Sequence, residues 1–301
     1  MSGVFPMWVV IPNWNLREDT IACVRSVLAA ATGLSVEVVV VDNGSTDDSP
    51  TALTATFGCR VRQLRLGRNA GFAGAVNAGL RYAFEQRAAS ALILNNDTVV
   101  DSRMLTVLGE AGRDYGEAGI LAPLIYCMEP ATRIWRMGDR DFGWLPIPRR
   151  IGDGEASRPV VEADYVTGCG MLVRREVVEA IGYLDERFFM YYEDADYCAR
   201  ARASGFRILC VPAAKMWHRV SASLRSDKAA LAYWRARGQV LFYRKHARRG
   251  RWRLAHTFIV GKTVVGLVQN VLGGRLAQAD ALLRGTLEGY RAPLDGTAGD
   301  G

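Results

Sequence analysis

Two stretches of the sequence place carboxylates where they can do chemistry. In the first, SALILNNDTVVDS, an apolar run ends abruptly in Asn95, Asn96 and Asp97. A carboxylate such as Asp97, together with the imidazole of His218, can hold Mg²⁺ or Mn²⁺ against a diphosphate, whose oxygens complete the shell with water. A simple turn uses the same residue types as Asn95 to Asp97, and a lone histidine is more often packed or on the surface. Neither feature is therefore decisive alone.

The second stretch, FFMYYEDADYCAR, leads from aromatic bulk into Glu193 and Asp194 at the expected start of a helix. An aspartate in a cleft is ionised near neutral pH and can accept a proton from an alcohol. Helix capping is the alternative explanation for these two acids. Asp196 and Arg200 are spaced i, i+4, which favours a structural ion pair.

Two further motifs have a binding and a structural interpretation each. In VDNGSTDDSP, Asp42 is either an acceptor for a nucleotide base or ribose hydroxyl, or part of a well-capped strand-turn-helix connection. The glycines of residues 68–79, RNAGFAGAVNAG, match neither G-x-G-x-x-G nor a P-loop, which disfavours hydride transfer and P-loop phosphoryl transfer. They still allow a diphosphate to approach a helix start, although close helix-sheet packing explains them equally well.

The elements that must position these residues alternate along the first 125 residues. The expected strands are 7–12, 36–42, 59–66, 91–95 and 118–125, and the expected helices are 17–30, 48–57, 71–86 and 102–115. This alternation predicts a parallel, doubly wound sheet. In such sheets ligands bind beyond the carboxyl ends of the strands, where Asn13, Asp42 and Asp97 follow their strands. Residues 126–160 are expected to be an irregular loop.

Composition and charge exclude several classes of protein. The chain has 301 residues, half of them hydrophobic, and a net charge of +7. Its six cysteines form no Cys-x-x-Cys pair, which argues against a structural zinc site and a disulfide scaffold. The first residues lack a signal-peptide pattern, and we expect a reducing, cytoplasmic location. The apolar run 254–272 is interrupted by polar residues, so we expect an interfacial rather than a transmembrane helix.

The C-terminal tail is expected to be helical and basic. Residues 235–253 contain eight Lys or Arg and no Asp or Glu. Basic residues near an anionic membrane contribute about 1 kcal/mol each, so this segment predicts peripheral membrane association. Four aromatic residues are candidates for the headgroup level: Trp234, Phe242, Tyr243 and Trp252. A solvated helix face is the alternative, and no motif indicates nucleic-acid binding.

Taken together, these motifs resemble those of family 2 inverting glycosyltransferases, and in particular the rhamnosyltransferase-like branch that builds bacterial cell-surface polysaccharides. The stretches that carry the resemblance occur in the family's order between about residues 7 and 223. They are VVIPNWN, VVVVDNGSTDDS, NAGFAGAVNAGL, LILNNDTVV, VTGCGMLVRREVVEAIGYLDERFFMYYEDADYCARARASGFRI and VPAAKMWHRVSAS.

The resemblance implies a role for particular residues. It makes Asp194 the catalytic base, and Asp97 and His218 the ligands of a divalent metal, Mg²⁺ or Mn²⁺. Residues implied to hold the nucleotide-diphospho-sugar are Pro12, Asn13, Asp42, Arg68, Asn69, Gly71, Phe72, Asn77, Asn96 and Asp97. Residues implied to bind the acceptor are Gly168, Cys169, Gly170, Glu193 and Trp217. Asn95 stands where the family's D-x-D motif begins, and the missing charge puts strict metal dependence in doubt.

The resemblance also implies the architecture and the reaction. We expect a GT-A fold, a Rossmann-like and mostly parallel sheet flanked by helices, over residues 1–225, with a nucleotide-binding half (1–125) and an acceptor and catalytic half (126–225). Residues 226–301 would form a basic helical C-terminal extension. The implied donor is a dTDP- or UDP-sugar, with rhamnose as the family-level expectation.

The implied acceptor is a hydroxyl of a glycan or of a polyprenyl-diphosphate-linked glycan, met at the inner face of the cytoplasmic membrane. Two other functions stay open at this stage. A catalytically inactive nucleotide-sugar-binding relative would keep most of the pattern. A sugar-1-phosphate nucleotidyltransferase shares a related sheet but normally needs an N-terminal Gly-rich loop with basic residues, which VVIPNWN lacks.

Overall fold

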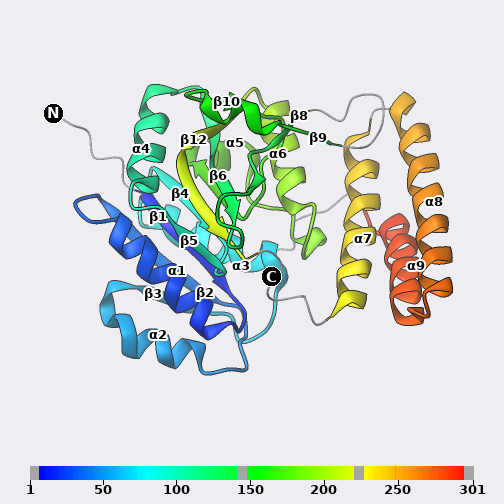
Figure 1. Cartoon of the computed structure of the whole chain (residues 1–301), viewed down its shortest axis with the longest axis horizontal. Helices are drawn as coiled ribbons and strands as arrows, with labels where there is room; N and C mark the ends of the chain where they lie inside the picture. Colours follow the sequence, from blue (N-terminus) through cyan, green and yellow to red (C-terminus); the bar gives the residue numbers. More distant parts are fainter. Residues whose placement is uncertain (1–6, 141–147, 220–226, 248, 295–301) are drawn as a thin grey trace.

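The computed structural model describes residues 7–140, 148–219, 227–247 and 249–294. Figure 1 shows a central sheet with helices on both sides and three C-terminal helices grouped at one end of the molecule. Every strand and helix predicted for the first 125 residues occurs. The predicted strand at 59–66 is shortened to Arg62–Arg65, because Gly58–Arg60 forms a 3₁₀ turn. A short strand, Thr98–Val100, was not predicted.

Ten strands of the described ranges form one sheet in the order β10-β12-β6-β11-β4-β1-β2-β3, with β5 beside β12 and β7 beside β6. Their bounds are β1 Met7–Asn13, β2 Val36–Asp42, β3 Arg62–Arg65, β4 Ser90–Leu94, β5 Thr98–Val100, β6 Ala118–Cys127, β7 Ile134–Arg136, β10 Val161–Glu162, β11 Gly170–Arg174 and β12 Arg207–His218. Strands β4, β1, β2 and β3 run parallel to one another, as predicted. Strand β11 is antiparallel to both neighbours, which makes the second half of the sheet mixed.

The helices follow the strands as a doubly wound fold requires. Their bounds are α1 Arg17–Ala30, α2 Ser49–Phe57, α3 Gly71–Glu85, α4 Met104–Asp114, α5 Arg175–Ile181, α6 Glu193–Ala203, α7 Lys228–His246, α8 Arg249–Leu272 and α9 Leu276–Arg291. The region predicted to be irregular contains β7, a two-stranded pair of β8 (Asp139–Arg140) and β9 (Arg149–Arg150), and a 3₁₀ turn (Asp153–Ser157). Part of that predicted loop, residues 141–147, lies outside the described residues.

The hydrophobic core lies on both faces of the sheet. Along β1, Val10 faces a cluster that includes Leu80 of α3, while Val9 and Ile11 face a cluster that includes Leu108 of α4. This alternation of fully buried side chains is what a sheet covered on both faces requires. Gly79 of α3 sits so close to Val10 that a Cβ there would collide with the valine side chain. Close helix-sheet packing is therefore part of what the glycines of this helix do.

Glycines also allow the C-terminal helices to pack closely. A Cβ on Gly285 of α9 would meet the Tyr233 backbone of α7, and one on Gly289 would lie 2.7 Å from Val240 Cβ. A third apolar cluster then joins α7 and α8 to α6 and the segment before it, through residues such as Ala195 and Phe188. The helices are consequently packed onto the sheet domain rather than trailing from it.

The basic residues of α7 are largely used inside the protein. Lys245 lies 2.8 Å from Asp185 and 2.7 Å from Asp196, and His246 Nε2 lies 2.7 Å from Asp196. Asp196 also pairs with Arg200 at 2.8 Å, the structural pair predicted from their spacing. Although burial opposes it, the hydrogen bond with His246 and the charge of Arg200 lower the pKa of Asp196. Two of the aromatic residues expected at a membrane surface, Phe242 and Tyr243, are buried.

Candidate active site

A cavity of about 410 Å³ lies beyond the carboxyl ends of β1 and β4, the edge indicated by the sequence. It brings together residues from widely separated parts of the chain, among them Asp97, Asp194 and His218. The other predicted site residues in its lining are Pro12, Asn13, Asn69, Phe72, Asn96, Gly168, Cys169 and Glu193. The cavity is therefore built from both halves of the sheet domain.

On the side of β1, a hydrogen-bonded network of polar side chains fixes the cavity wall. Asn13 is fully buried, and its amide donates to Asp42 Oδ1 at 3.2 Å and to Ser45 Oγ at 3.1 Å. Its oxygen accepts from Thr20 Oγ1 at 2.7 Å and from Asn96 Nδ2 at 3.1 Å. Asp42 lies outside the cavity lining and acts on it by holding Asn13.

The adjacent wall is the start of α3, which Asn43 shapes. Its amide donates to Asn69 Oδ1 at 3.1 Å and to the Gly71 carbonyl at 3.0 Å, and its oxygen accepts from Ala70 N–H at 2.8 Å. Gly71 has a φ of +77°, which favours glycine. Arg68, three residues before Gly71, is exposed and lies outside the lining of the cavity.

Asp97 and His218 meet because β5 pairs with β12, in a register that sets Thr98 opposite His218. Their closest atoms, Asp97 Oδ1 and His218 Nε2, are 3.1 Å apart, and both side chains are buried. The His218 ring packs edge-on against Trp135 at 4.6 Å between centroids. Within the described residues, its Nδ1 has no hydrogen-bond partner.

This pair fits one side of a divalent-metal site. Adjacent ligands of an octahedral ion at about 2.1 Å lie about 3 Å from each other, which matches the separation of the Asp97 and His218 atoms. No group of three or more His, Cys, Asp or Glu side chains suited to a metal occurs among the residues the structure describes. A metal held here would therefore draw its remaining ligands from a bound diphosphate and water.

Asp194, at the start of α6, is oriented by three donors. Its Oδ2 accepts from Tyr165 Oη at 2.9 Å and from Gly168 N–H at 3.0 Å, and its Oδ1 accepts from Ala195 N–H at 2.8 Å. Burial, together with the nearby charge of Asp194, raises the pKa of Tyr165 well above its usual value, which keeps that hydroxyl a donor. Oδ1 retains a lone pair toward the cavity for a further donor.

The neighbouring Glu193 differs from Asp194 in its hydrogen bonding. It is buried, and its Oε2 has no hydrogen-bond partner in the described part of the chain. Burial and the charge of Asp194 raise the pKa of Glu193 well above its ordinary value of 4.5. Burial of this kind favours the neutral form of a carboxyl group, which can donate a hydrogen bond to a ligand in the same cavity.

The backbone segment directly before Glu193 and Asp194 is strained, and it sets the position of these two acids. Phe189, Tyr191 and Tyr192 have φ values of 56°, 66° and 73°, a region that non-glycine residues rarely adopt. Two glycines hold the segment from opposite sides. A Cβ on Gly71 would lie 2.5 Å from the Phe189 carbonyl oxygen, and one on Gly238 of α7 would lie 2.6 Å from that of Tyr191. Strain of this kind persists only where the surroundings enforce it, and it clusters at functional sites.

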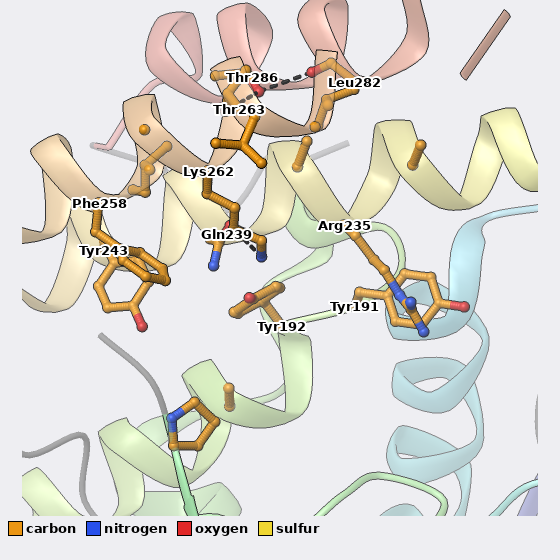
Figure 2. A pocket seen from close by; sticks show the side chains of 18 of the residues that line it. Tyr191, Tyr192, Arg235, Gln239, Tyr243, Phe258, Lys262, Thr263, Leu282 and Thr286 are labelled. Carbon is orange, nitrogen blue, oxygen red and sulfur yellow. Dashed lines mark hydrogen bonds between the residues drawn. The ribbon is translucent and has the colours of Figure 1, made fainter. Parts of the chain in front are cut away.

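A second, larger cavity of about 980 Å³ adjoins the first and extends between α6 and the C-terminal helices. Figure 2 shows side chains of α7 and α8 reaching toward Tyr191 and Tyr192. The residues common to both cavities are Trp135, Arg136, Thr167, Tyr191, Asp194 and Arg235. The two spaces thus meet at the carboxylate of Asp194.

Besides Asp42, Arg68 and Gly71, three more predicted contact residues lie outside the lining of this cavity. Asn77 is buried inside α3, where its amide bonds both the N–H and the carbonyl of Leu184. Gly170 lies in the sheet core, where a Cβ would meet Met216 Sδ at 2.7 Å. Trp217 stacks on Tyr126 and donates to the Ala131 carbonyl. Successive side chains of a strand point to opposite faces, so Trp217 turns away from the cavity that its neighbour His218 lines.

Sequence reasoning did not select several residues that line the first cavity. They are Trp14, Asn43, Trp135, Arg136, Thr167, Met190, Tyr191 and Arg235. Tyr165, which bonds Asp194 from outside this lining, was not selected either. Asn43 directly follows Asp42, and Tyr191 lies two residues before Glu193. Both could therefore have been found as near neighbours of predicted site residues. Arg235 had no such signal, because only the packing of α7 brings it to the site.

The profile of glycosyl transferase family 2 matches residues 8–182, more than half of the chain. The match includes the β1, β2, α3 and β4 motifs that form the polar walls of the cavity. The chain therefore belongs to glycosyl transferase family 2, and the enzyme class predicted from its motifs is confirmed. The matched range ends before Asp194 and the C-terminal helices.

Curated relatives agree with this assignment. The chain is 29% identical over 227 residues to N-acetylglucosaminyl-diphospho-decaprenol L-rhamnosyltransferase of Mycobacterium tuberculosis, covering 67% of this chain and 73% of the relative. It is 26% identical to the dTDP-rhamnosyl transferase RfbF of Shigella flexneri, covering 84% and 88%. A low-salt glycan biosynthesis hexosyltransferase of Haloferax volcanii is 28% identical, and the chain spans 62% of its length.

Solved structures confirm the GT-A fold. A mannosyltransferase from Pyrobaculum calidifontis, solved with GDP-mannose and Mn²⁺, superposes with a TM-score of 0.58 at 16% identity, covering 95% of this chain and 87% of that one. GalNAc-T7, solved with UDP, GalNAc and Mn²⁺, gives a TM-score of 0.61 at 16% identity, over 81% of this chain and 48% of that one. The predicted fold class is therefore correct.

Proposed function

We propose that this protein transfers a sugar, with inversion, from a nucleotide-diphospho-sugar to a hydroxyl group of a glycan or a lipid-linked glycan. The observation that carries the proposal is the convergence of Asp97, His218 and Asp194 on one cavity. Asp97 and His218 supply a polar, buried pair suited to a diphosphate. Asp194 supplies an oriented carboxylate suited to accept a proton.

The reaction is a single displacement. Asp194 Oδ1 accepts the proton of the acceptor hydroxyl, and the acceptor oxygen forms its bond to the anomeric carbon. The bond between that carbon and the diphosphate oxygen breaks, and the nucleoside diphosphate leaves with the electron pair. General-base assistance of this kind contributes about 10²- to 10⁴-fold.

Asp97 and His218 would hold a divalent ion against the diphosphate. When bound, such an ion neutralises the charge of the leaving group. With only two protein ligands, the site would bind the metal mainly together with the nucleotide sugar. Mn²⁺ in the related solved structures supports this assignment.

The names of two relatives support a choice of donor and acceptor. Two of them are rhamnosyltransferases by name, and the name of one specifies dTDP-rhamnose chemistry. The other names a diphospho-decaprenol acceptor. We therefore assign a dTDP- or UDP-sugar, with rhamnose first, as the donor, and a polyprenyl-diphosphate-linked glycan as the acceptor. The division into residues 1–225 for transfer and 226–301 as an extension belongs to the same proposal.

We also assign a peripheral contact with an anionic membrane, made by α8. No helix of the described residues is long and apolar enough to span a bilayer. Helix α8 nevertheless exposes Val264, Val268 and Val271 at 51–54%, and it contains four basic and no acidic residues. An apolar stripe on an acid-free basic helix suits an anionic lipid surface. The free cysteines suit the reducing, cytoplasmic side.

Liposome flotation tests the membrane contact. Wild type should float with anionic vesicles at low salt and less at high salt, and a Val264→Asp, Val268→Asp variant should not float. Failure of the wild type to bind anionic vesicles, or a dimer in solution that the same variant dissociates, would overturn this assignment.

A thermal-shift screen of nucleotide sugars, with and without Mn²⁺, tests the transfer function. A ligand at 100 times its dissociation constant adds about 2.7 kcal/mol of stability. We expect one dTDP- or UDP-sugar to stabilise the protein, more so with Mn²⁺. Absence of stabilisation by every nucleotide sugar would refute the donor site. Binding without transfer would leave the inactive relative, and synthesis of nucleotide sugar from a sugar 1-phosphate would identify the nucleotidyltransferase.

A further inference from the structure

Two of the cations that line the larger cavity are Lys262, which is not part of the smaller cavity's lining, and Arg235, which lines both cavities. Arg235 of α7 lies with its guanidinium 4.9 Å from the centre of the Tyr191 ring. Lys262 of α8 donates from Nζ to Gln239 Oε1 at 3.1 Å. Neither cation has a carboxylate within 4.0 Å among the residues that the structure describes. Figure 2 shows both side chains directed into the same space, on either side of Gln239.

The two cations also disfavour each other. Lys262 is accessible from the open cavity, yet the surrounding protein and the charge of Arg235 together lower its pKa. Like charges that share a cavity without a counter-ion form a site for an anion, because a bound anion relieves their repulsion. The third cation of the lining, Arg136, already pairs with Asp139 at 3.1 Å and so adds less to this site.

The rest of the lining is suited to an apolar chain. Its apolar members come mainly from α7, α8 and α9: Ala232, Ala236, Tyr243, Phe258, Ile259, Val265 and Leu282. Val265 is 55% exposed and so belongs both to the cavity and to the apolar surface of α8. The lining therefore combines apolar side chains of the C-terminal helices, the cations Lys262 and Arg235, and the carboxylate of Asp194.

From this combination of surfaces we propose that the larger cavity is the acceptor site and takes a phosphate- or diphosphate-linked apolar chain, with Lys262 and Arg235 binding the phosphate. The chain lies along α8 and α9, and the sugar that follows the phosphate reaches Asp194. This assignment rests on the proposed transfer function. The assignment adds to that function the residues and the chemical features that select the acceptor.

A binding experiment on the full chain tests the site with a defined probe, farnesyl diphosphate. Farnesol and inorganic pyrophosphate serve as its two separate halves. Titrations are run once with EDTA, and once with MnCl₂ and saturating dTDP, so that a probe held in the donor site would be displaced. The variants are Lys262→Gln and Arg235→Gln. Lys228→Gln is the matched control, because Lys228 is exposed and lines neither cavity.

We expect farnesyl diphosphate to bind under both conditions, and each half alone to bind at least about 10-fold more weakly. Lys262→Gln and Arg235→Gln should each weaken binding of the whole probe about 10-fold or more, and Lys228→Gln should not. Absence of farnesyl diphosphate binding, equal affinity of Lys262→Gln and wild type, or displacement by dTDP would overturn the assignment.

The same preparations separate this assignment from the proposed function. Stabilisation by dTDP with Mn²⁺ reports the donor site and should be the same in wild type and Lys262→Gln. Failure of dTDP to bind while farnesyl diphosphate binds through Lys262 would refute the transfer function alone. Normal dTDP binding with no effect of Lys262→Gln on the probe would refute the acceptor site alone.

Discussion

The two cavities that meet at Asp194 are built in opposite ways. The smaller one is walled by strand ends whose polar side chains bond one another, as Asn13 bonds Asp42, Ser45, Thr20 and Asn96. The larger one is walled by helices, and its cations Arg235 and Lys262 have no acidic partner in the described residues. A satisfied polar network holds a fixed shape, whereas unpaired cations leave affinity available for a ligand. The fold thus joins a polar, internally bonded cavity, the proposed donor site, to a cavity with unpaired cations, the proposed acceptor site.

The largest expected effect comes from the residue shared by both cavities. Asp194→Asn removes the proton acceptor, and we expect the transfer rate to fall about 10²- to 10⁴-fold while nucleotide-sugar binding stays within about 2-fold. Single-turnover transfer and a binding titration measure the two quantities. Asp280→Asn, which alters only a surface pair with Arg284, is the control. A normal transfer rate in Asp194→Asn would show that the base is another group.

On the donor side, Asp97→Asn should abolish the extra stabilisation that Mn²⁺ gives to bound nucleotide. Removing a metal ligand leaves His218 as the only protein ligand, and we expect transfer to fall at least about 10-fold. Thermal shift with nucleotide and a Mn²⁺ series measures this. Asp101→Asn, beyond β5, should behave like wild type. Equal Mn²⁺ dependence in Asp97→Asn and wild type would refute the metal assignment.

The sequence indicated more of the residues that line the smaller cavity than of those that line the larger one. Asp97, Asn13 and Asn69 stand in local motifs at the ends of strands, and hydrophobic periodicity locates strand ends. Arg235 and Lys262 lie 27 residues apart on two helices, and only the packing of α7 against Tyr191, which Gly238 permits, brings Arg235 to the site. The sequence predicts peripheral membrane association for residues 235–253, because local sequence shows no acidic partner for their charges. Asp185 and Asp196, the partners of Lys245, are more than 40 residues away along the chain.

The contact between α7 and the strained segment before α6 can be tested by comparing two glycine-to-alanine substitutions. Gly238→Ala would force its Cβ against the Tyr191 carbonyl, and overpacking of this kind costs about 1–3 kcal/mol. Gly109→Ala in α4 meets nothing within 4 Å and should stabilise by up to about 1 kcal/mol. Urea denaturation measures both. Equal stabilities of the two variants would show that the strained segment does not depend on α7.

The smallest expected effect is a pH slope from Glu193. Its pKa is raised in the folded protein, so the folded state binds more protons than the unfolded state above pH 4.5. Stability should therefore fall as pH rises from 4.5 through the raised pKa, by up to about 1.4 kcal/mol per pH unit. Glu193→Gln should flatten this slope in urea denaturation at several pH values, and Glu179→Gln on the surface should not. Parallel pH profiles for wild type and Glu193→Gln would contradict a protonated Glu193.

The central claim is that an acceptor hydroxyl, activated by Asp194, displaces the diphosphate directly from the sugar. The measurement that tests it most directly is the anomeric configuration of the transferred sugar, read by NMR from the product made with the nucleotide sugar that the thermal-shift screen selects. A single displacement predicts an anomeric configuration opposite to that of the donor. A product with the donor's configuration would require two displacements and would contradict the assignment of Asp194 as a base.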